Sequence, residues 1–211
     1  MGGIADMSRS LNLSDTQARE AYAARAVKNK KYLERLISLH SEGSRSKRQQ
    51  AAATVYLAAQ AKPERLIEQS DAIFDALMRP EAQTRWECLR ALACLVPAGL
   101  KLRKNEIALV EDALFDEDSG NVREAAFLLL CTYGATTKSA SKKVWSLLDE
   151  AIQCYHGNPE FAAMLSSLIE FAKGKIDPEI KDALKERMAF DAENGVGTHG
   201  MRSKQIVDAC K

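Results

Sequence analysis

The stretch Asn121-Val122-Arg123-Glu124-Ala125-Ala126 decides the fold of this chain of 211 residues. A polar residue, a branched apolar residue and an arginine stand before small residues. Two related stretches precede it, Thr84-Arg85-Trp86-Glu87-Cys88-Leu89 and Lys47-Arg48-Gln49-Gln50-Ala51-Ala52. Apolar residues continue from them at steps of three and four, which is the period of an amphipathic helix. The sequence therefore predicts helices, and it contains no alternating strand pattern.

The arginines of these stretches mark a repeat. Arg48, Arg85 and Arg123 are 37 and 38 residues apart, and Ala162 and Arg202 hold the next two places. This period divides the chain into four helical hairpins, each with a first and a second helix. Their predicted bounds are Ser46–Met78, Pro80–Phe115, Ser119–Tyr155 and Asn158–Phe190. Because one hairpin cannot cover all of its own apolar stripes, we expect the hairpins to stack.

The Asx-Val-Arg step followed by small residues resembles HEAT repeats of the armadillo-like class, in which it opens one helix of each hairpin. The resemblance covers about residues 44–211 and implies an all-α, right-handed α-α superhelix of about four hairpins. Residues 14–43 are predicted to form N-terminal capping helices, and residues 1–13 a disordered or tag-like N-terminus. The motifs predict the fold, whereas the function has to be argued from surface residues.

Composition excludes several classes of protein. Apolar residues make up 46% of the chain and the formal net charge is +1, so no global field draws the chain to nucleic acid or membranes. No apolar run is long enough to cross a bilayer. The five cysteines form no CxxC pair and three lie in apolar helical runs, which favours reduced thiols. We therefore expect a cytoplasmic protein.

Motifs for catalysis or metal binding are absent from the sequence. His40, His156 and His199 have no second ligand at metal spacing. A GxGxxG string spans residues 195–200, but it follows a predicted helix, whereas dinucleotide binding requires a preceding strand. The buried cysteines have no adjacent base. The prediction is no enzyme, no catalytic residue, no cofactor and no metal site.

Charges are distributed unevenly over the hairpins. The turns from first to second helix are basic, the turns from second to first helix are acidic, and the second helices themselves carry many acids. The predicted acidic face consists of Glu68, Asp71, Asp75, Glu111, Asp112, Asp149 and Glu150. The predicted anion-binding edge consists of Lys101, Arg103, Lys104, Lys138, Lys142, Lys143, Lys173 and Lys175. Exposed lysines in turns are also common as simple solvated residues.

Two functional hypotheses follow from this pattern. If the second helices line the concave face, an acidic groove there suits a basic or amphipathic peptide or a partner helix. The chain would then be a protein–protein interaction scaffold. The alternative is nucleic-acid binding through the basic edge, with DNA repair as a role, because some HEAT-like proteins are glycosylases for alkylated bases. Trp86 is either a surface anchor or a gap filler, and Trp145 is predicted to lie in the core.

Overall fold

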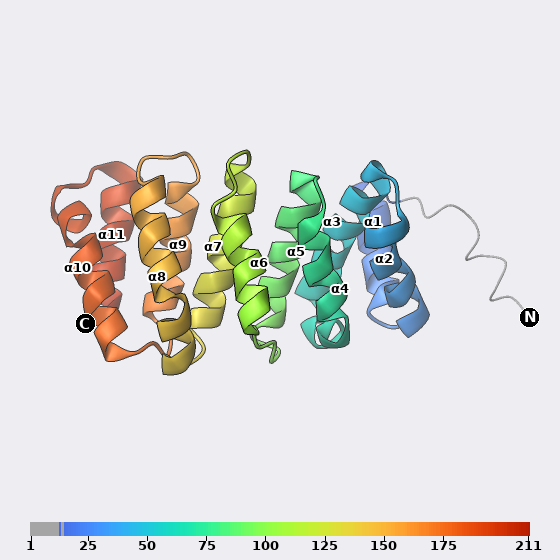
Figure 1. Cartoon of the computed structure of the whole chain (residues 1–211), viewed down its shortest axis with the longest axis horizontal. Helices are drawn as coiled ribbons and strands as arrows, with labels where there is room; N and C mark the ends of the chain where they lie inside the picture. Colours follow the sequence, from blue (N-terminus) through green and yellow to red (C-terminus); the bar gives the residue numbers. More distant parts are fainter. Residues whose placement is uncertain (1–12, 14) are drawn as a thin grey trace, which may run out of the picture.

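A computed structural model describes Leu13 and residues 15–211. Within this range every regular element is a helix, and the predicted all-α solenoid is confirmed (Figure 1). The first helices and the unpaired last helix are α3 (Arg45–Ala61), α5 (Ala82–Leu95), α7 (Gly120–Gly134), α9 (Phe161–Ala172) and α11 (Gly197–Ala209). The second helices are α4 (Ser70–Asp75), α6 (Lys104–Leu114), α8 (Lys138–Tyr155) and α10 (Pro178–Asn194). Ahead of them stand α1 (Thr16–Ala26) and α2 (Lys30–Glu42).

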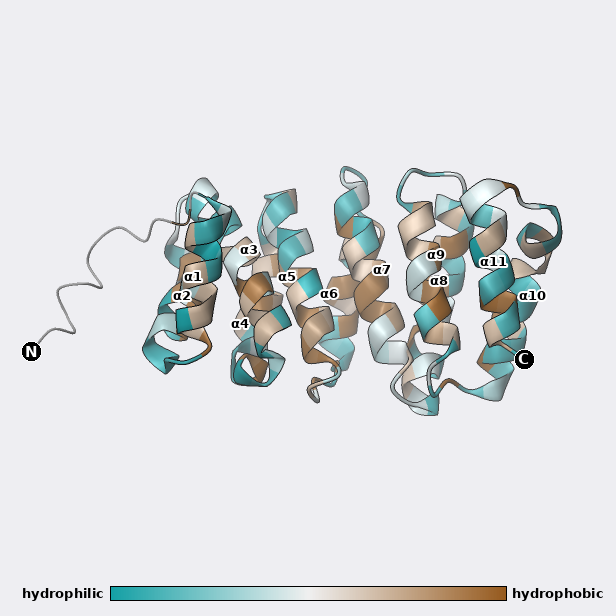
Figure 2. Cartoon of the chain, turned by 180° about the vertical axis from the view of Figure 1, so that it is seen from behind, coloured by the Kyte–Doolittle hydropathy of each residue, from teal (hydrophilic) through white to brown (hydrophobic). Residues whose placement is uncertain are grey.

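The helices form two parallel layers (Figure 1). The odd-numbered helices α1 to α11 make one layer, which is seen from its own side in Figure 2 and in which each helix packs directly against the next. The even-numbered helices α2 to α10 make the other layer, which faces the viewer in Figure 1. The tag-like segment predicted for residues 1–13 lies, apart from Leu13, outside the described residues.

Small residues hold the odd-numbered layer together. Ala51, Ala52, Ala125 and Ala126 are fully buried where these helices meet. Their small side chains let neighbouring helix axes approach closely, and the Leu and Phe side chains beside them fill the remaining space. A Cβ on Gly134 would lie 2.6 Å from the Phe171 ring, so the packing of α7 on α9 requires a glycine there. The small residues of the sequence pattern therefore mark the layer with the closest packing.

The second helix of the first hairpin differs from the prediction of one regular helix. Residues 63–78 form two short 3-10 turns, the six-residue helix α4 and a third 3-10 turn (Ala76–Met78). Leu66, Ile73 and Phe74 are nevertheless buried in the core. Tertiary packing of these apolar side chains holds the segment in place although its backbone hydrogen bonding is irregular.

The repeat arginines join successive hairpins. Arg123 Nε donates to Glu160 Oε1 at 2.6 Å, and its Nη1 donates to the Asp116 carbonyl oxygen at 2.7 Å. Arg48 pairs with Glu81 and Arg85 with Asp116 in the same way. These three pairs, in which each arginine reaches the acid that precedes the next first helix, are called the arginine clamps below. Three acids of the turns from second to first helix, Glu81, Asp116 and Glu160, are therefore occupied inside the stack.

The clamp changes where the arginine is missing. Ala162 holds the repeat position in α9, and Arg202 of α11 donates a hydrogen bond to the Ala162 carbonyl oxygen. The link between α9 and α11 therefore runs in the opposite direction, from the later helix back to a backbone acceptor of the earlier one.

His40 belongs to α2 and is buried on the side of this helix that faces the second helix of the first hairpin. Its side chain is 3% exposed, and neither ring nitrogen has a hydrogen-bond partner among the described residues. Burial, together with the nearby positive charge of Arg79, lowers the pKa of His40 to about 4. The folded protein therefore holds this imidazole neutral at pH values where an exposed histidine is protonated.

Replacing Arg123 with methionine should lower the free energy of unfolding by about 2–4 kcal/mol, because Glu160 is then left largely buried without its partner. Arg35→Met is the matched control: Arg35 pairs with Glu42 at an exposed site. Its loss should stay below about 1 kcal/mol. Urea unfolding of the two variants measures both changes. Equal losses in the two variants would show that the clamp adds nothing beyond an ordinary surface ion pair.

The free energy of unfolding should also depend on His40 protonation. The folded-state pKa is lowered to about 4, so the stabilising contribution is complete above pH 6.5 and is lost as the pH falls toward 4. The expected loss is roughly 3 kcal/mol at pH 4. His40→Leu removes this titration, so the difference in stability between wild type and variant should change over this pH range. A difference that stays constant with pH contradicts the prediction.

Candidate partner-binding face

The layer of second helices is the open side of the molecule. The odd-numbered helices pack against one another along the stack, whereas grooves separate α2 from α4, α6 from α8 and α8 from α10. Both kinds of side chain, apolar and charged, are accessible in these grooves. This layer, formed by α2, α4, α6, α8 and α10, is called the second-helix face below.

The groove between α6 and α8 has a volume of about 940 Å³. Its floor is mostly apolar and consists of Leu102, Ile107, Ala108 and Leu147. Two lysines and one glutamate also line this groove, namely Lys104, Lys143 and Glu111. Ile107 and Leu147 are only half-buried, so the groove exposes apolar surface that the fold itself does not cover.

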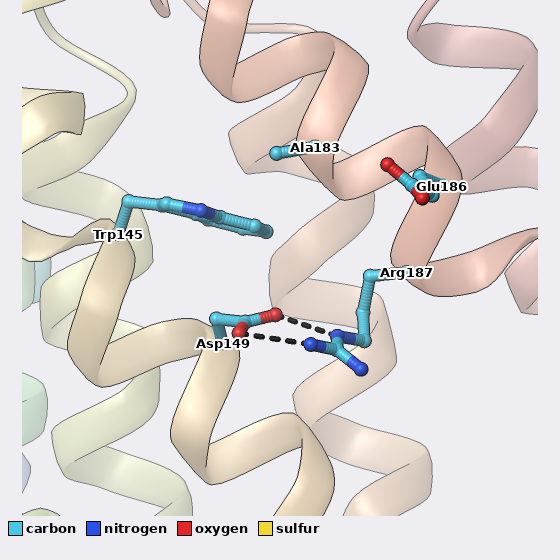
Figure 3. A pocket seen from close by; sticks show the side chains of 5 residues that line it. All are labelled: Trp145, Asp149, Ala183, Glu186 and Arg187. Carbon is cyan, nitrogen blue, oxygen red and sulfur yellow. Dashed lines mark hydrogen bonds and ion pairs between the residues drawn. The ribbon is translucent and has the colours of Figure 1, made fainter.

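A slot of about 450 Å³ lies on the other side of α8, between α8 and α10. Trp145 extends its indole across the slot toward Ala183, and Asp149 lies below it (Figure 3). Arg187 Nε donates to Asp149 Oδ1 at 2.6 Å and Nη2 donates to Oδ2 at 3.0 Å. These bonds raise the pKa of Arg187. The carboxylate of Glu186 is exposed at the same slot.

The slot has the chemistry for a cationic side chain. An ammonium or guanidinium over an indole face gains a cation–π interaction, and a nearby carboxylate adds charge pairing. Glu186 has no ion-pair partner in the described part of the chain and is available for this role. Trp145 and Glu186 therefore form a candidate site for a lysine or arginine of a partner.

The predicted acidic residues occupy two kinds of position. Four of them line grooves between second helices: Glu68, Asp75, Glu111 and Asp149. Asp71 is exposed and pairs with Arg103, while Asp112 and Glu150 are exposed away from these grooves. The structure thus brings four of the seven acids into grooves. Two of these four already have an ion-pair partner: Glu68 lies 3.8 Å from Lys30, and Asp149 is held by Arg187.

The predicted basic residues are all exposed, and their turns follow one another along the lower edge of the molecule in Figure 1. Arg103 is held by Asp71 and Glu106. Lys142 Nζ lies 3.3 Å from Asp177, and Lys173 Nζ lies 2.8 Å from Glu170. Five residues of this edge have no carboxylate partner among the described residues: Lys101, Lys104, Lys138, Lys143 and Lys175.

No metal centre is found among the residues that the structure describes. They contain no group of three or more His, Cys, Asp or Glu side chains that could hold a metal ion. Burial raises the pKa of the Cys88 and Cys131 thiols, so both stay protonated and unreactive. Among the same residues, no helix is long and apolar enough to cross a membrane.

The two tryptophans lie in different layers of the stack. Trp145, predicted to lie in the core, is half-buried: it packs on the core and also lines the slot. Trp86 is half-buried in the odd-numbered layer. The missed signal for Trp145 is its position beside the buried stripe of α8, which already includes Val144 and Leu148.

Comparison with known proteins supports the fold. No family model matches the chain, and no curated protein matches its sequence. Among solved structures it is similar to a designed armadillo repeat protein in complex with the peptide (KR)4, with a TM-score of 0.68, 15% identity and coverage of 95% of this chain and 96% of that one. Computationally designed armadillo repeat proteins for modular peptide recognition give a TM-score of 0.64 and 16% identity, covering 94% of this chain and 96% of theirs.

An archaeal HEAT-like repeat protein from Thermococcus onnurineus is also similar, with a TM-score of 0.50, 13% identity and 92% coverage of both chains. These likenesses place the chain in the HEAT/armadillo-like repeat fold, as the arginine stretches predicted. That fold is typical of protein-interaction scaffolds and is typically non-catalytic.

Proposed function

We propose that this chain is a non-catalytic scaffold that binds a partner protein or peptide through its second-helix face. The observation that carries the proposal is the set of open grooves on this face, one with exposed apolar side chains and one with an indole beside carboxylates. Binding sites commonly combine such an apolar floor with a few polar groups that fix orientation. The sequence leaves open which helix of each hairpin lines the concave face, and the second-helix face as the concave side stays a prediction.

The charge of the face favours a basic or amphipathic segment as partner. Glu111, Glu150 and Glu186 are exposed and have no ion-pair partner among the described residues. Trp145 adds the aromatic surface on which a cationic side chain can lie. A designed protein of similar fold is known in complex with the cationic peptide (KR)4, which supports a cationic peptide as the first probe.

Nucleic-acid binding by the basic edge is less well supported. Three of its eight basic residues are already paired with carboxylates, and the net charge of the chain is only +1. Phosphate-driven binding depends steeply on salt, so duplex DNA at about 50 mM salt is the discriminating ligand. We expect no measurable DNA binding there.

The proposal predicts that a fluorescently labelled (KR)4 peptide binds the folded chain at low salt. Reversal of Glu111, Asp112, Asp149 and Glu150 to lysine should weaken this binding by at least about tenfold, which is a loss of about 1.4 kcal/mol. The matched control reverses four exposed acids elsewhere, Glu20, Glu117, Asp118 and Glu193, and changes the net charge equally. Fluorescence anisotropy titrations of the three proteins measure the difference.

Equal weakening in both charge variants would reduce the effect to long-range attraction and contradict a site on the second-helix face. Failure of wild type to bind the peptide would contradict the preference for a basic partner. DNA binding that falls steeply with salt would favour the basic edge instead. Circular dichroism of each variant confirms that it is folded before its binding is compared.

A second prediction isolates the slot. Trp145→Ala should weaken (KR)4 binding by about fivefold to tenfold, since a cation–π contact contributes about 1 kcal/mol. Trp86→Ala is the control, because Trp86 is also half-buried but belongs to the odd-numbered layer. Equal effects of the two substitutions would exclude the slot as the peptide's anchor.

A further inference from the structure

We propose that the groove between α6 and α8 binds an amphipathic helix of the partner, with a carboxylate at one end and a basic side chain at the other. This inference rests on the proposed scaffold function and assigns the partner's chemistry at one groove. On the bound face of that helix, an acidic and a basic residue occupy positions i and i+7, in either order, with apolar residues at i+3 and i+4 between them.

This groove differs from its neighbours in how its charges are paired. Lys30 of α2 pairs with Glu68, and this ion pair bridges the gap between α2 and the second helix of the first hairpin. Asp71 pairs with Arg103 across the gap between α4 and α6. Asp149 and Arg187 bridge the gap between α8 and α10. In the part of the chain that the structure describes, no ion pair crosses the gap between α6 and α8.

The charges that border this unbridged gap are left unmatched. Lys104 on α6 and Lys143 on α8 are exposed on opposite walls, both near the turns from first to second helix. Glu111 is exposed farther along α6. None of the three has an ion-pair partner among residues 15–211. A partner with a carboxylate facing the lysines and a cation facing Glu111 supplies the missing pairs.

The apolar floor lies between these charges. Ile107 and Ala108 on α6 face the same groove as Leu147 on α8, and all three are accessible from solvent. At the far end, Tyr155 Oη donates to the Leu114 carbonyl oxygen at 2.9 Å and ties α8 to α6. This bond joins the C-terminal ends of α6 and α8, beyond the residues that line the groove. The apolar floor suits the apolar side of an amphipathic element.

The spacing of the charges fits two turns of helix. Lys104 and Glu111 are seven residues apart on α6, which corresponds to about 10 Å along the helix axis at 1.5 Å per residue. Residues i and i+7 of a partner helix lying along the groove have the same separation, and i+3 and i+4 lie between them on the same face. The matched distance is why we commit to a helix whose two charged residues are seven residues apart; distance alone sets no direction, so either order of the two charges fits.

Two helical peptides of the same composition test the proposal. Each has about 15 residues on an alanine-rich background, the length that gives measurable helicity in isolation. The first carries Glu, Leu, Leu and Arg at i, i+3, i+4 and i+7, and the second keeps the two leucines and moves Glu and Arg to i+2 and i+9, on the opposite side of the helix. We expect the first to bind wild type at least about fivefold more tightly in calorimetric titrations, a difference of about 1 kcal/mol.

Protein variants identify the groove as the site. Leu147→Glu should weaken binding of the first peptide by about tenfold or more. Leu109→Glu is the matched control, a half-buried leucine of α6 that does not line this groove, and should change binding by less than about twofold. A triple variant, Lys104→Ala, Lys143→Ala and Glu111→Ala, should abolish the preference between the two peptides.

Equal binding of the two peptides, or an unchanged preference in the triple variant, would overturn the proposal. If (KR)4 binds and neither helical peptide does, the groove proposal fails while the scaffold function stands. If none of the three peptides binds, both fail. Concentration-dependent self-association that Leu147→Glu abolishes would assign the groove to a second copy of this chain and also overturn the partner helix.

Discussion

Arg48, Arg85 and Arg123 each join the start of one first helix to a carboxylate in the turn that opens the next hairpin. The carboxylate cannot be supplied from within the arginine's own hairpin, so the pair forms only when two hairpins are stacked in the correct register. In the arginine clamps both side chains are largely buried, and a slipped stack would leave buried charges unpaired. The clamps thus specify the register, while the apolar contacts between the odd-numbered helices supply most of the favourable free energy.

The clamps and the small residues act on the same layer, and this determines where binding surface is left. Close packing of α3, α5, α7 and α9 satisfies the apolar stripes of the first helices. The second helices cover these from one side only, and grooves remain between them. Ion pairs such as Asp149–Arg187 partly fill these spaces without closing them. Accessible grooves on the second-helix face are therefore a consequence of how the stack is held together.

The stack could be predicted from the sequence because the residues that set its register recur at a regular spacing. Arg85 and Arg123 could be aligned directly, and the helices around them followed from apolar spacing. The irregular second helix of the first hairpin was missed, since buried Leu66 and Phe74 hold residues 63–78 in place whatever their local backbone. The grooves were missed for a different reason: each is lined by residues from two neighbouring hairpins, so no single stretch of sequence contains one.

Charge counting along the chain had a similar limit. It assigned seven acids to the second-helix face without showing which are available, and the structure separates Asp149, held by Arg187, from Glu111, which has no such partner among the described residues. It also treated the acids of the opposite turns as one surface, whereas Glu81, Asp116 and Glu160 are the carboxylates of the arginine clamps. Pairing depends on contacts between hairpins, which composition cannot show.

The helix α8 connects the two candidate binding surfaces. Trp145 and Leu147 are two residues apart, which places them about 200° apart around the helix, one toward α10 and the other toward α6. Val144 and Leu148 lie between these two flanks when the helix is viewed along its axis. Both are fully buried and fix the rotation of α8 on the core. A change on one flank therefore leaves the other flank in place, and a partner that occupies both grooves has to cross α8. The affinity of such a partner would combine two separable contributions, a cation against the indole of Trp145 and an apolar side against Leu147.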